Sequence, residues 1–584
     1  MKHTFLAVSI LAGLSSQALA ATYQLTELPR YEGAKYTFIS DVNDNGQIIG
    51  AATSLFNLPI DVSYIDFDDA TIKNAYDQAK RSYEQIDEEI SFTLEDIKNG
   101  AAATNADANR FMLSFLGARA NSAEYQKLQD RIALDIDAIS AQEHVLFDVE
   151  NSDTNGLTRS TSNYLTAISE DGVMVGWGSA PFSKTTFTPE GQSDEETFFI
   201  RDWSSRGVVI TPQGEKVILE PEFTEHGGYS IATDIKKLDN GGYVVVGQSS
   251  VGIPENRQKN YDDNCDSKDE PLQVCRWLQQ VSSRQFYDLR AFKWQLDESF
   301  NVISTTNLGL GLTPKDDEND AFVSAALAVN KAGVTVGYSP YRGEEDGSVA
   351  YPFNIAGYFE DGKLVPFKEL ENRAATGKAT DINNNNIAIG YMGRRVGNGS
   401  ILDQYGFYYD LNTKEYTQMP YFFKGSSTIT TDINDAGYII GQAEIEKNSS
   451  NRRREGFIYK VGDEKLLNIN DLLPCKDDSG NNYPYTVAEA IKITESNHIY
   501  AIATKTVERR DRLGNIEKDS NGEIEYESVT LPVLLTPTPQ GQIEDCAPPE
   551  AETYERQSGS ALLLSLLVMP FAWLRRKKLK LLVR

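Results

Sequence analysis

The sequence predicts an all-β protein, a seven-bladed β-propeller with one helical insertion in its first blade. A short hairpin motif recurs seven times, and most copies are followed by two further strand-like segments. The two ends of the repeat region supply strands that would close a ring. An open β-solenoid is the alternative architecture, because repeats determine closure only loosely.

The recurring motif is clearest at residues 431–441 (TDINDAGYIIG). A β-branched run, an Asn-x-x-Gly turn and an alternating Ile/Val run that ends in Gly form the pattern of a β-hairpin. At Asn386 and Asn497 Asn replaces the turn Gly, and Asn tolerates the left-handed conformation that Gly would adopt. The copies lie near 41–50, 167–176, 234–247, 328–337, 381–390, 432–441 and 492–501. The turn and closing residues assigned to them are Asn43, Gly46, Gly50, Gly172, Gly176, Asn330, Gly333, Gly337, Asn383, Gly390, Asn434, Gly437 and Gly441.

Two more strands complete most units. An aromatic strand follows the hairpin, as at 406–407 and 456–457, and an aliphatic one comes next, as at 363–367. Four short strands in about fifty residues is the content of a propeller blade. The last unit has a third strand at 529–535 and no obvious fourth, whereas 23–28 (YQLTEL) resembles a fourth strand without a blade. Pairing these two segments would close the ring within 21–546 and remove its exposed edges.

Residues 68–141 interrupt the β pattern. Apolar residues from Ile72 to Ile97 recur at spacings of three and four, which predicts a helix. A second apolar series, from Tyr125 to Ile139, follows a sequence at 121–124 that resembles a capping box, and predicts another helix. We expect the outer strand of the first blade only after this insertion, near 144–149. The insertion either packs on the propeller or projects to bind a partner.

Both termini carry targeting patterns. Residues 1–20 combine Lys2, an apolar run and a small-residue cleavage site that ends at Ala20, which predicts a secretory signal peptide. At the other end an acidic and polar spacer, 547–560, precedes a hydrophobic and basic segment, 561–580. The apolar part would be about 21 Å long as a helix, which is short for a membrane span. The tail is predicted to be a sorting or anchor segment.

The four cysteines predict two disulfides rather than a metal site, because the chain is expected to be exported. Of the three pairings we choose the local pair Cys265–Cys275, and Cys475–Cys546. The first pair lies in an acidic insertion, 260–277. Weak candidates for a cation site there are Asp262, Asp263, Asp266 and Asp269, but they lack the spacing of a calcium loop. A solvated disulfide loop is the favoured interpretation.

Composition excludes several classes of function. The formal net charge is −29, which disfavours nucleic acid and anionic lipid as partners. Beyond the signal peptide the histidines are His144, His226 and His498, without ligand spacing, and no phosphate-binding glycine loop occurs. The segment Asp41-x-Asn43-x-Asn45 matches half of a calcium loop, but position twelve is Ala52. We therefore expect these side chains to cap turns, and no cofactor.

The Asn-x-x-Gly hairpin followed by an Ala/Gly-Phe strand resembles the HAF repeat of exported bacterial proteins. The chain as a whole, with its leader, helical insertion and basic tail, resembles the uncharacterised DUF3466 family of Gram-negative bacteria. That resemblance implies no known activity and no catalytic residues. The tail resembles a GlyGly-type sorting signal cut by a rhombosortase, although Ser558-Gly559-Ser560 lacks the paired glycines.

These observations predict an exported scaffold without catalysis that binds a protein or polysaccharide in the periplasm, at the cell surface or outside the cell. Its tail would contact the membrane, and a sorting protease if it is processed. One alternative is a propeller hydrolase or lyase that acts on glycans through carboxylates in the channel. Another is a structural surface protein stabilised by calcium.

Overall fold

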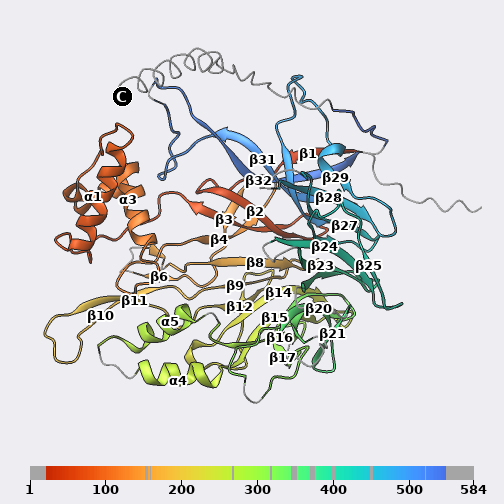
Figure 1. Cartoon of the computed structure of the whole chain (residues 1–584), viewed down its shortest axis with the longest axis horizontal. Helices are drawn as coiled ribbons and strands as arrows, with labels where there is room; N and C mark the ends of the chain where they lie inside the picture. The colour runs from red at the N-terminus through yellow and green to blue at the C-terminus, as the bar shows by residue number, and fades with distance from the viewer. Residues whose placement is uncertain are drawn as a thin grey trace, which may run out of the picture. The chain divides into compact units, whose positions relative to one another are not determined.

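The computed structural model describes residues 22–546 apart from 152–155, 158, 266–268, 284, 316–317, 343–351, 369–374, 397–400, 448–451, 520 and 539. Seven four-stranded antiparallel sheets follow one another in a ring, so the chain is a seven-bladed β-propeller, as predicted (Figure 1). The ring and its insertions form one compact unit that ends at Ile543, and Glu544 begins a second unit.

Each of the first six blades is a meander that runs outward from the ring axis. Blade 1 contains β2 (Ala34–Val42), β3 (Ile48–Leu55), β4 (Arg131–Ile136) and β5 (Ala141–Glu143), and blade 2 contains β8 (Asn163–Ile168), β9 (Met174–Gly178), β12 (Arg206–Ile210) and β13 (Lys216–Leu219). Blade 3 contains β14 (Ser230–Lys237), β15 (Tyr243–Gly252), β16 (Asp288–Leu296) and β17 (Val302–Asn307), and blade 4 contains β18 (Ala325–Val329), β19 (Thr335–Tyr341), β20 (Phe353–Glu360) and β21 (Lys363–Pro366). Blade 5 contains β22 (Ala375–Ile382), β23 (Ile387–Val396), β24 (Ile401–Asp410) and β25 (Glu415–Gln418), and blade 6 contains β26 (Thr428–Ile433), β27 (Tyr438–Glu444), β28 (Arg454–Lys460) and β29 (Leu467–Asn468).

Blade 7 closes the ring with strands from both ends of the propeller. It contains β30 (Thr486–Ile493), β31 (Ile499–Glu508), β32 (Tyr526–Thr538) and, as its outer strand, β1 (Thr22–Glu27). Strand β1 pairs antiparallel with β32, with Leu25 opposite Leu535. This is the closure expected from the sequence, and it completes blade 7 as a four-stranded sheet.

A β-bulge in each inner strand explains why the hairpin motif ends in glycine. In blade 6 the bulge lies between Thr430 and Asp432, opposite Gly441. A Cβ atom on Gly441 would lie 2.1 Å from the carbonyl oxygen of Ile429. Blades 1 to 5 have the same bulge and the same close approach to their closing glycine. Blade 7 has two bulges in its inner strand, and there Ala501 takes the place of glycine.

The connections divide the ring into two faces. In a four-stranded meander the first and third turns lie at one end of the blade, and the second connection lies at the other end with the link to the next blade. We call the first end the turn face and the second the insertion face. The second connection carries all the large insertions between described strands, namely 56–130 in blade 1, 179–205 in blade 2, 253–287 in blade 3 and 509–525 in blade 7.

The blade 1 insertion is a helical arm, residues 56–130. It contains α1 (Ala70–Glu84), α2 (Leu94–Lys98), the 3₁₀ turn η1 (Ala101–Ala103) and α3 (Ala106–Gly117). Asp69, Thr93 and Asn105 cap the N-termini of the three α-helices. Ile72 and Met112 are buried in a small core that belongs to the arm itself. The arm therefore has its own apolar interior.

The second helix predicted within 121–139 is wrong. Residues 131–136 form strand β4, and the outer strand of blade 1 is β5 at 141–143 rather than a segment near 144–149. Ile132, Leu134 and Ile136 are all buried. These three residues alternate along the strand and pack into the core on one side of the sheet. The spacing of four between Ile132 and Ile136 fits a strand as well, because four is a multiple of its period of two.

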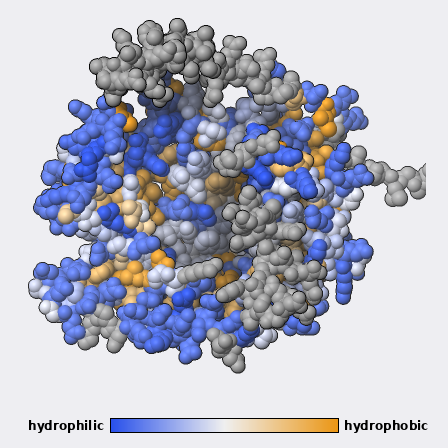
Figure 2. Space-filling model, in the orientation of Figure 1, coloured by the Kyte–Doolittle hydropathy of each residue, from blue (hydrophilic) through white to orange (hydrophobic). Residues whose placement is uncertain are grey.

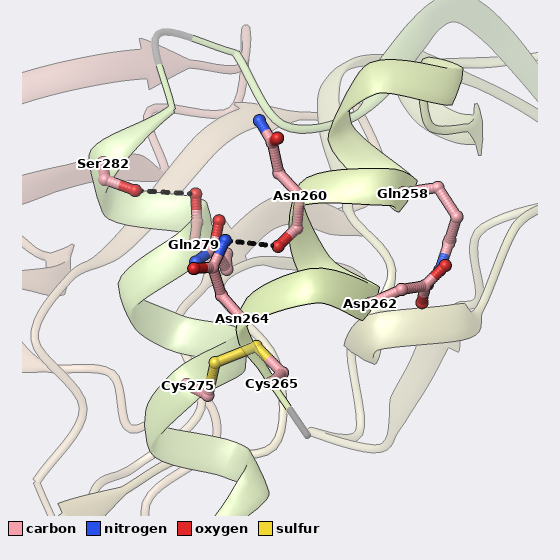
Figure 3. The surroundings of a disulfide bond; sticks show 8 residues. All are labelled: Gln258, Asn260, Asp262, Asn264, Cys265, Cys275, Gln279 and Ser282. Carbon is pink, nitrogen blue, oxygen red and sulfur yellow. Dashed lines mark hydrogen bonds between the residues drawn. A yellow bond between two sulfur atoms is a disulfide. The ribbon is translucent and has the colours of Figure 1, made fainter. Parts of the chain in front are cut away.

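The blade 3 insertion is helical, which corrects the expected solvated loop. It contains α4 (Glu255–Asn264) and α5 (Leu272–Ser282), each beginning after a proline. The predicted disulfide between Cys265 and Cys275 is confirmed, with 5.6 Å between the Cα atoms. Figure 3 shows the bridge joining the end of α4 to α5. Cys475 and Cys546 are disulfide-bonded as well, so none of the four cysteines, all of which are described, is free.

The remaining insertions are short. Blade 2 inserts a hairpin of β10 (Ser183–Phe187) and β11 (Glu196–Ile200), and a small ribbon of β6 (Glu150–Asn151) and β7 (Gly156–Leu157) precedes the blade. The 3₁₀ turns η3 (Glu225–Gly227) and η4 (Ile469–Leu472) complete the described elements. In blade 7 residues 509–525 extend the β31–β32 hairpin, with bridges between Arg510 and Ile516 and between Lys518 and Ile524.

The visible surface is largely hydrophilic, with a few hydrophobic patches (Figure 2). No helix within the described ranges is both long and apolar enough to cross a membrane. The predicted leader at 1–20, the spacer at 547–560 and the tail at 561–580 lie outside the described residues, and so do Ala20, Ser558, Gly559 and Ser560.

Candidate functional site

A pocket of about 340 Å³ lies on the ring axis at the turn face, and we call it the axial pocket. All seven blades line it, because each contributes the end of its inner strand and the following turn. Its charged lining residues are Asp41, Asp44, Glu170, Lys236, Lys237, Asp239, Lys331, Asp381, Asp435, Lys492 and Glu495. The sequence motif therefore places its polar residues around one central cavity.

Four aspartates tie neighbouring blades together at the base of this pocket. In each case Oδ2 accepts a hydrogen bond from a backbone N–H in the inner strand of the next blade. The pairs are Ile168 N to Asp41 (2.9 Å), Val329 N to Asp234 (2.9 Å), Ile433 N to Asp381 (3.1 Å) and Ile493 N to Asp432 (2.8 Å). Each bond satisfies a backbone donor on the inner strand of a sheet, which has no further strand on that side.

Two lysines balance part of this negative charge. Lys492 occupies in blade 7 the position that aspartate holds in blades 1, 3, 5 and 6. Its Nζ lies 2.9 Å from Asp432 Oδ1 and 3.4 Å from Asp41 Oδ1, so one ammonium group bridges carboxylates from two other blades. Lys236 Nζ lies 2.8 Å from Asp234 Oδ1. Burial alone would lower the pKa of Lys492, but Asp41, Asp432 and Asp381 raise it well above its usual value.

Among the described residues no lysine lies within ion-pair distance of Asp381, whereas Asp41, Asp234 and Asp432 each pair with one. Burial raises the pKa of Asp381 to about 8, and the nearby Asp432 carboxylate contributes to the rise. Lys492 and Lys236 offset only part of that effect. The raised pKa favours the protonated form of Asp381, which lines the axial pocket.

The raised pKa of Asp381 makes a prediction for stability. Between the ordinary Asp pKa of about 4 and about 8, the folded state holds a proton that the unfolded state has released. The contribution of this group to stability is therefore full below pH 4 and falls as pH rises, by at most about 1.4 kcal/mol per pH unit. Asp381→Asn mimics the protonated acid and keeps an acceptor for Ile433 N. In urea unfolding at pH 5 to 9, the variant should lose less stability with rising pH than the parent. If the free energies of unfolding of the variant and the parent fall equally with rising pH, the raised pKa of Asp381 is contradicted.

The asparagines of the motif serve both their own turn and the next blade. Asn434 Oδ1 accepts from Tyr438 N at 2.9 Å, which caps its own hairpin turn, and Asn43, Asn330 and Asn383 do the same. The Nδ2 groups of these four residues donate to carbonyl oxygens in the next blade, namely those of Ser169, Asn383, Asn434 and Thr494. The Oδ1 atom of Asn43 thus accepts a hydrogen bond within its own turn. The side chain serves the hairpin, which is the role expected for it rather than that of a calcium ligand.

The bulge threonines were missed by sequence reasoning. Thr431 Oγ1 donates to Ala490 O at 2.6 Å and Thr233 Oγ1 to Ala326 O at 2.8 Å, in both cases across to the next blade. Thr166 makes the same bond to Ala232 O, and Thr380 contacts the Thr430 hydroxyl. Most copies have a serine or threonine directly before the motif. This residue gave no sign of a special role, because β-branched residues are common in strands.

The structure separates the other sequence candidates. Asp262 and Asp263 lie on α4, where they bond to Gln258 and Lys259, and Asp266 lies outside the described residues. No group of three potential metal ligands occurs in the described part of the chain. The three histidines lie in separate places: His144 contacts Asp135 (2.6 Å), His226 packs on Tyr261, and His498 contacts Ser496.

On the insertion face the four insertions join into one continuous wall. The arm bonds to the blade 2 hairpin through Phe199 N and Ala123 O (2.7 Å), and Lys127 of the arm lies over the ring of Trp277 in α5. On its other side the arm meets the blade 7 hairpin, where Arg110 pairs with Glu517. The apolar core shared by the arm, β10–β11 and α5 contains Ala123, Phe182, Phe198, Phe199, Val274 and Trp277. The wall, defined as 56–130, 179–205, 253–287 and 509–525, thus spans blades 7, 1, 2 and 3.

Comparison with solved structures returns several proteins at very low sequence identity. A protein of unknown function from Dyadobacter fermentans is 9% identical, with a TM-score of 0.33, over 68% of this chain and 97% of its own. A polysaccharide lyase of family PL25, an ulvan lyase, is 7% identical, with a TM-score of 0.36, over 83% and 92%. An acylaminoacyl peptidase from Pyrococcus horikoshii is 11% identical, with a TM-score of 0.29, over 63% and 52%. Overlaps of this quality say nothing about function.

No curated protein matches the sequence. One family does match, described as "Protein of unknown function (DUF3466)", and the match covers residues 1–577. It includes every blade, the arm and all four cysteines, and it agrees with the family resemblance inferred from the chain as a whole. The chain therefore belongs to the DUF3466 family.

Proposed function

We propose that this protein is an exported binding scaffold that engages a cell-envelope or extracellular partner, protein or polysaccharide, through its insertion face. The propeller supplies a rigid frame and the wall supplies the contact surface. Export is supported by the disulfide-bonded cysteines, because disulfides persist in oxidising compartments outside the cytoplasm.

The observation that carries this proposal is the asymmetry of the two faces. The turn face consists of short turns that hydrogen bonds lock to their neighbours, as when Asp435 N donates to Glu495 and Asn384 N donates to Asp435. The long insertions all lie on the opposite face and pack against one another. Long ordered insertions on a repeat scaffold are where binding surfaces are usually found.

The test compares the same substitution on the two faces. Ile86 in the arm and Ile516 in the blade 7 hairpin are exposed on the wall, and Ile139 is exposed in a turn on the turn face. We expect Ile86→Asp and Ile516→Asp together to weaken binding to purified envelope and capsular fractions of the producing cells about tenfold, since charge at an apolar contact costs more than 1 kcal/mol. Ile139→Asp should leave binding unchanged. Binding is measured by co-sedimentation of the full mature chain.

An equal loss of binding in the double variant and in Ile139→Asp would indicate non-specific adhesion and would overturn the proposal. Loss in Ile139→Asp alone would move the binding surface to the turn face. All three residues are exposed, so the variants are expected to fold, and thermal unfolding confirms this before binding is measured.

A glycan-cleaving enzyme is the second candidate, because the axial pocket brings Asp381, whose pKa is raised, together with other carboxyl groups. General acid catalysis on glycosides needs one protonated and one ionised carboxyl group. Against it, Asp41, Asp234, Asp381 and Asp432 each commit one oxygen to a neighbouring blade. Release of sugar ends from polysaccharides by the parent, and its loss in Asp381→Asn, would favour the enzyme over the scaffold.

A further inference from the structure

A second pocket, of about 380 Å³, lies where blade 7 meets blade 1, and we call it the seam pocket. It is lined by the β1–β2 connection, the end of β31, the start of β32 and Phe56 directly after β3. These segments are a blade-to-blade link and the second connections of two blades. The seam pocket therefore opens on the insertion face, at the foot of the wall.

Two lysines of this pocket are held in ion pairs with glutamates. Lys35 Nζ lies 2.6 Å from Glu527 Oε2, and Lys505 Nζ lies 2.8 Å from Glu27 Oε2. Tyr485 OH completes the second group, at 3.0 Å from both Lys505 Nζ and Glu27 Oε2. The lining also contains two further basic residues, Arg30 and Arg510, and two further acidic ones, Glu32 and Glu508. Counting Glu27, basic and acidic groups balance, although the whole chain carries a net charge of −29.

Aromatic rings provide the rest of the contact surface. Tyr526 is 63% exposed and lines the pocket together with Tyr31 and Phe56. A tyrosine this exposed at the start of a strand makes little contribution to the core, so its ring is available to a ligand. Aromatic faces pack against the C–H faces of other groups and gain from the water they exclude.

We propose that the seam pocket binds a neutral saccharide unit, with its ring against Tyr526 and its hydroxyl groups on the paired lysine and glutamate side chains. The inference rests on the proposed scaffold function and names the ligand class. Side chains held in ion pairs keep free donors and acceptors in fixed positions, which suits hydroxyl groups that both donate and accept. The pocket has equal numbers of basic and acidic groups, so it offers an anionic ligand no net electrostatic attraction. The net negative charge of the chain repels such a ligand at long range. The dense polar lining disfavours an apolar ligand.

Neighbouring contacts hold this pocket in shape. Asn57 N donates to Arg512 O at 2.8 Å, which joins the start of the arm to the blade 7 hairpin. Arg509 pairs with both Glu517 and Glu525 within that hairpin. The strand that carries Tyr526 is thus fixed to the arm and to its own hairpin, so a ligand meets a preformed site.

The experiment is titration calorimetry of the full mature chain with five neutral hexasaccharides, from cellulose, xylan, mannan, chitin and starch. Oligogalacturonate is the anionic comparator and an acidic hexapeptide the peptide comparator. At least one neutral hexasaccharide should bind, and 0.5 M NaCl should leave its affinity unchanged, because salt screens charge and not stacking. Tyr526→Ala should weaken it about tenfold. The control is Tyr421→Ala, which removes a tyrosine that is 44% exposed and does not line the pocket, and should have no effect.

Four results would overturn the assignment: no binding by any neutral hexasaccharide, tighter binding of oligogalacturonate that weakens with salt, tighter binding of the acidic peptide, or equal losses in both tyrosine variants. Ile86 and Ile516, which test the scaffold function, do not line the seam pocket. If envelope binding depends on those two residues while Tyr526→Ala changes nothing, the scaffold stands and the saccharide site fails. If oligosaccharide binding depends on Tyr526 but no envelope fraction binds, the reverse holds.

Discussion

Replacing Lys492 with methionine is expected to lower the free energy of unfolding by about 3 to 5 kcal/mol at pH 7. The change keeps the length of the side chain but removes the ammonium group that bridges Asp41 and Asp432. Those buried carboxylates then face each other and Asp381 with only Lys236 as a nearby counter-charge. Urea unfolding followed by tryptophan fluorescence measures the loss.

The pH dependence distinguishes lost charge pairing from lost packing. The pKa of Lys492 is raised in the folded state, so its stabilisation is complete at pH 7 and disappears only as pH rises through that raised value. In Lys492→Met the free carboxylates take up protons as pH falls, so the deficit should shrink between pH 7 and pH 5. Adding Asp432→Asn should recover part of the loss at pH 7. A deficit independent of both changes would mean that Lys492 acts through packing alone.

Gly441→Ala is expected to destabilise the protein by about 3 kcal/mol, the upper end of overpacking by one methyl group. The added Cβ would lie 2.1 Å from a backbone oxygen of the inner strand and 2.9 Å from Thr430 Cα, and neither can move without breaking the bulge. Because the bulge also positions Asp432, the tie from blade 6 to blade 7 should weaken with it. Chemical unfolding gives the magnitude.

The matched control is Gly252→Ala, a strand glycine with no atom within 4 Å of the added methyl group and without a positive φ. It should be neutral or stabilising by a few tenths of a kcal/mol. Ala501→Gly should cost only about 0.5 to 1 kcal/mol, because the second bulge of blade 7 already leaves room for a methyl group. A Gly441→Ala effect as small as that of Gly252→Ala would refute the steric explanation of the closing glycine.

The amino-acid sequence was enough to predict the repeat, the number of blades and the closure of the ring. These features depend on turn chemistry within a few residues, as at Asn386 and Asn497, which adopt φ values of 63° and 62° where other blades use glycine. The local disulfide was predictable for the same reason, since ten residues separate its cysteines. The helix expected over 121–139 failed because a spacing of four fits both a helix and an alternating strand, and the pairing of β4 with β3 decided between them.

The contacts that the polar residues of the motif make between blades could be identified only in the folded structure. Asp41 and Ile168 are 127 residues apart, and Asn383 and Asn434 are 51 apart, so no local pattern shows that each joins two blades. Lys492 stands where other copies of the motif have aspartate, and it belongs to a charge cluster drawn from five blades. The wall and the seam pocket likewise assemble from segments hundreds of residues apart. Ring closure brings them together, because the free energy of a buried charge or an apolar cluster depends on its neighbours in space.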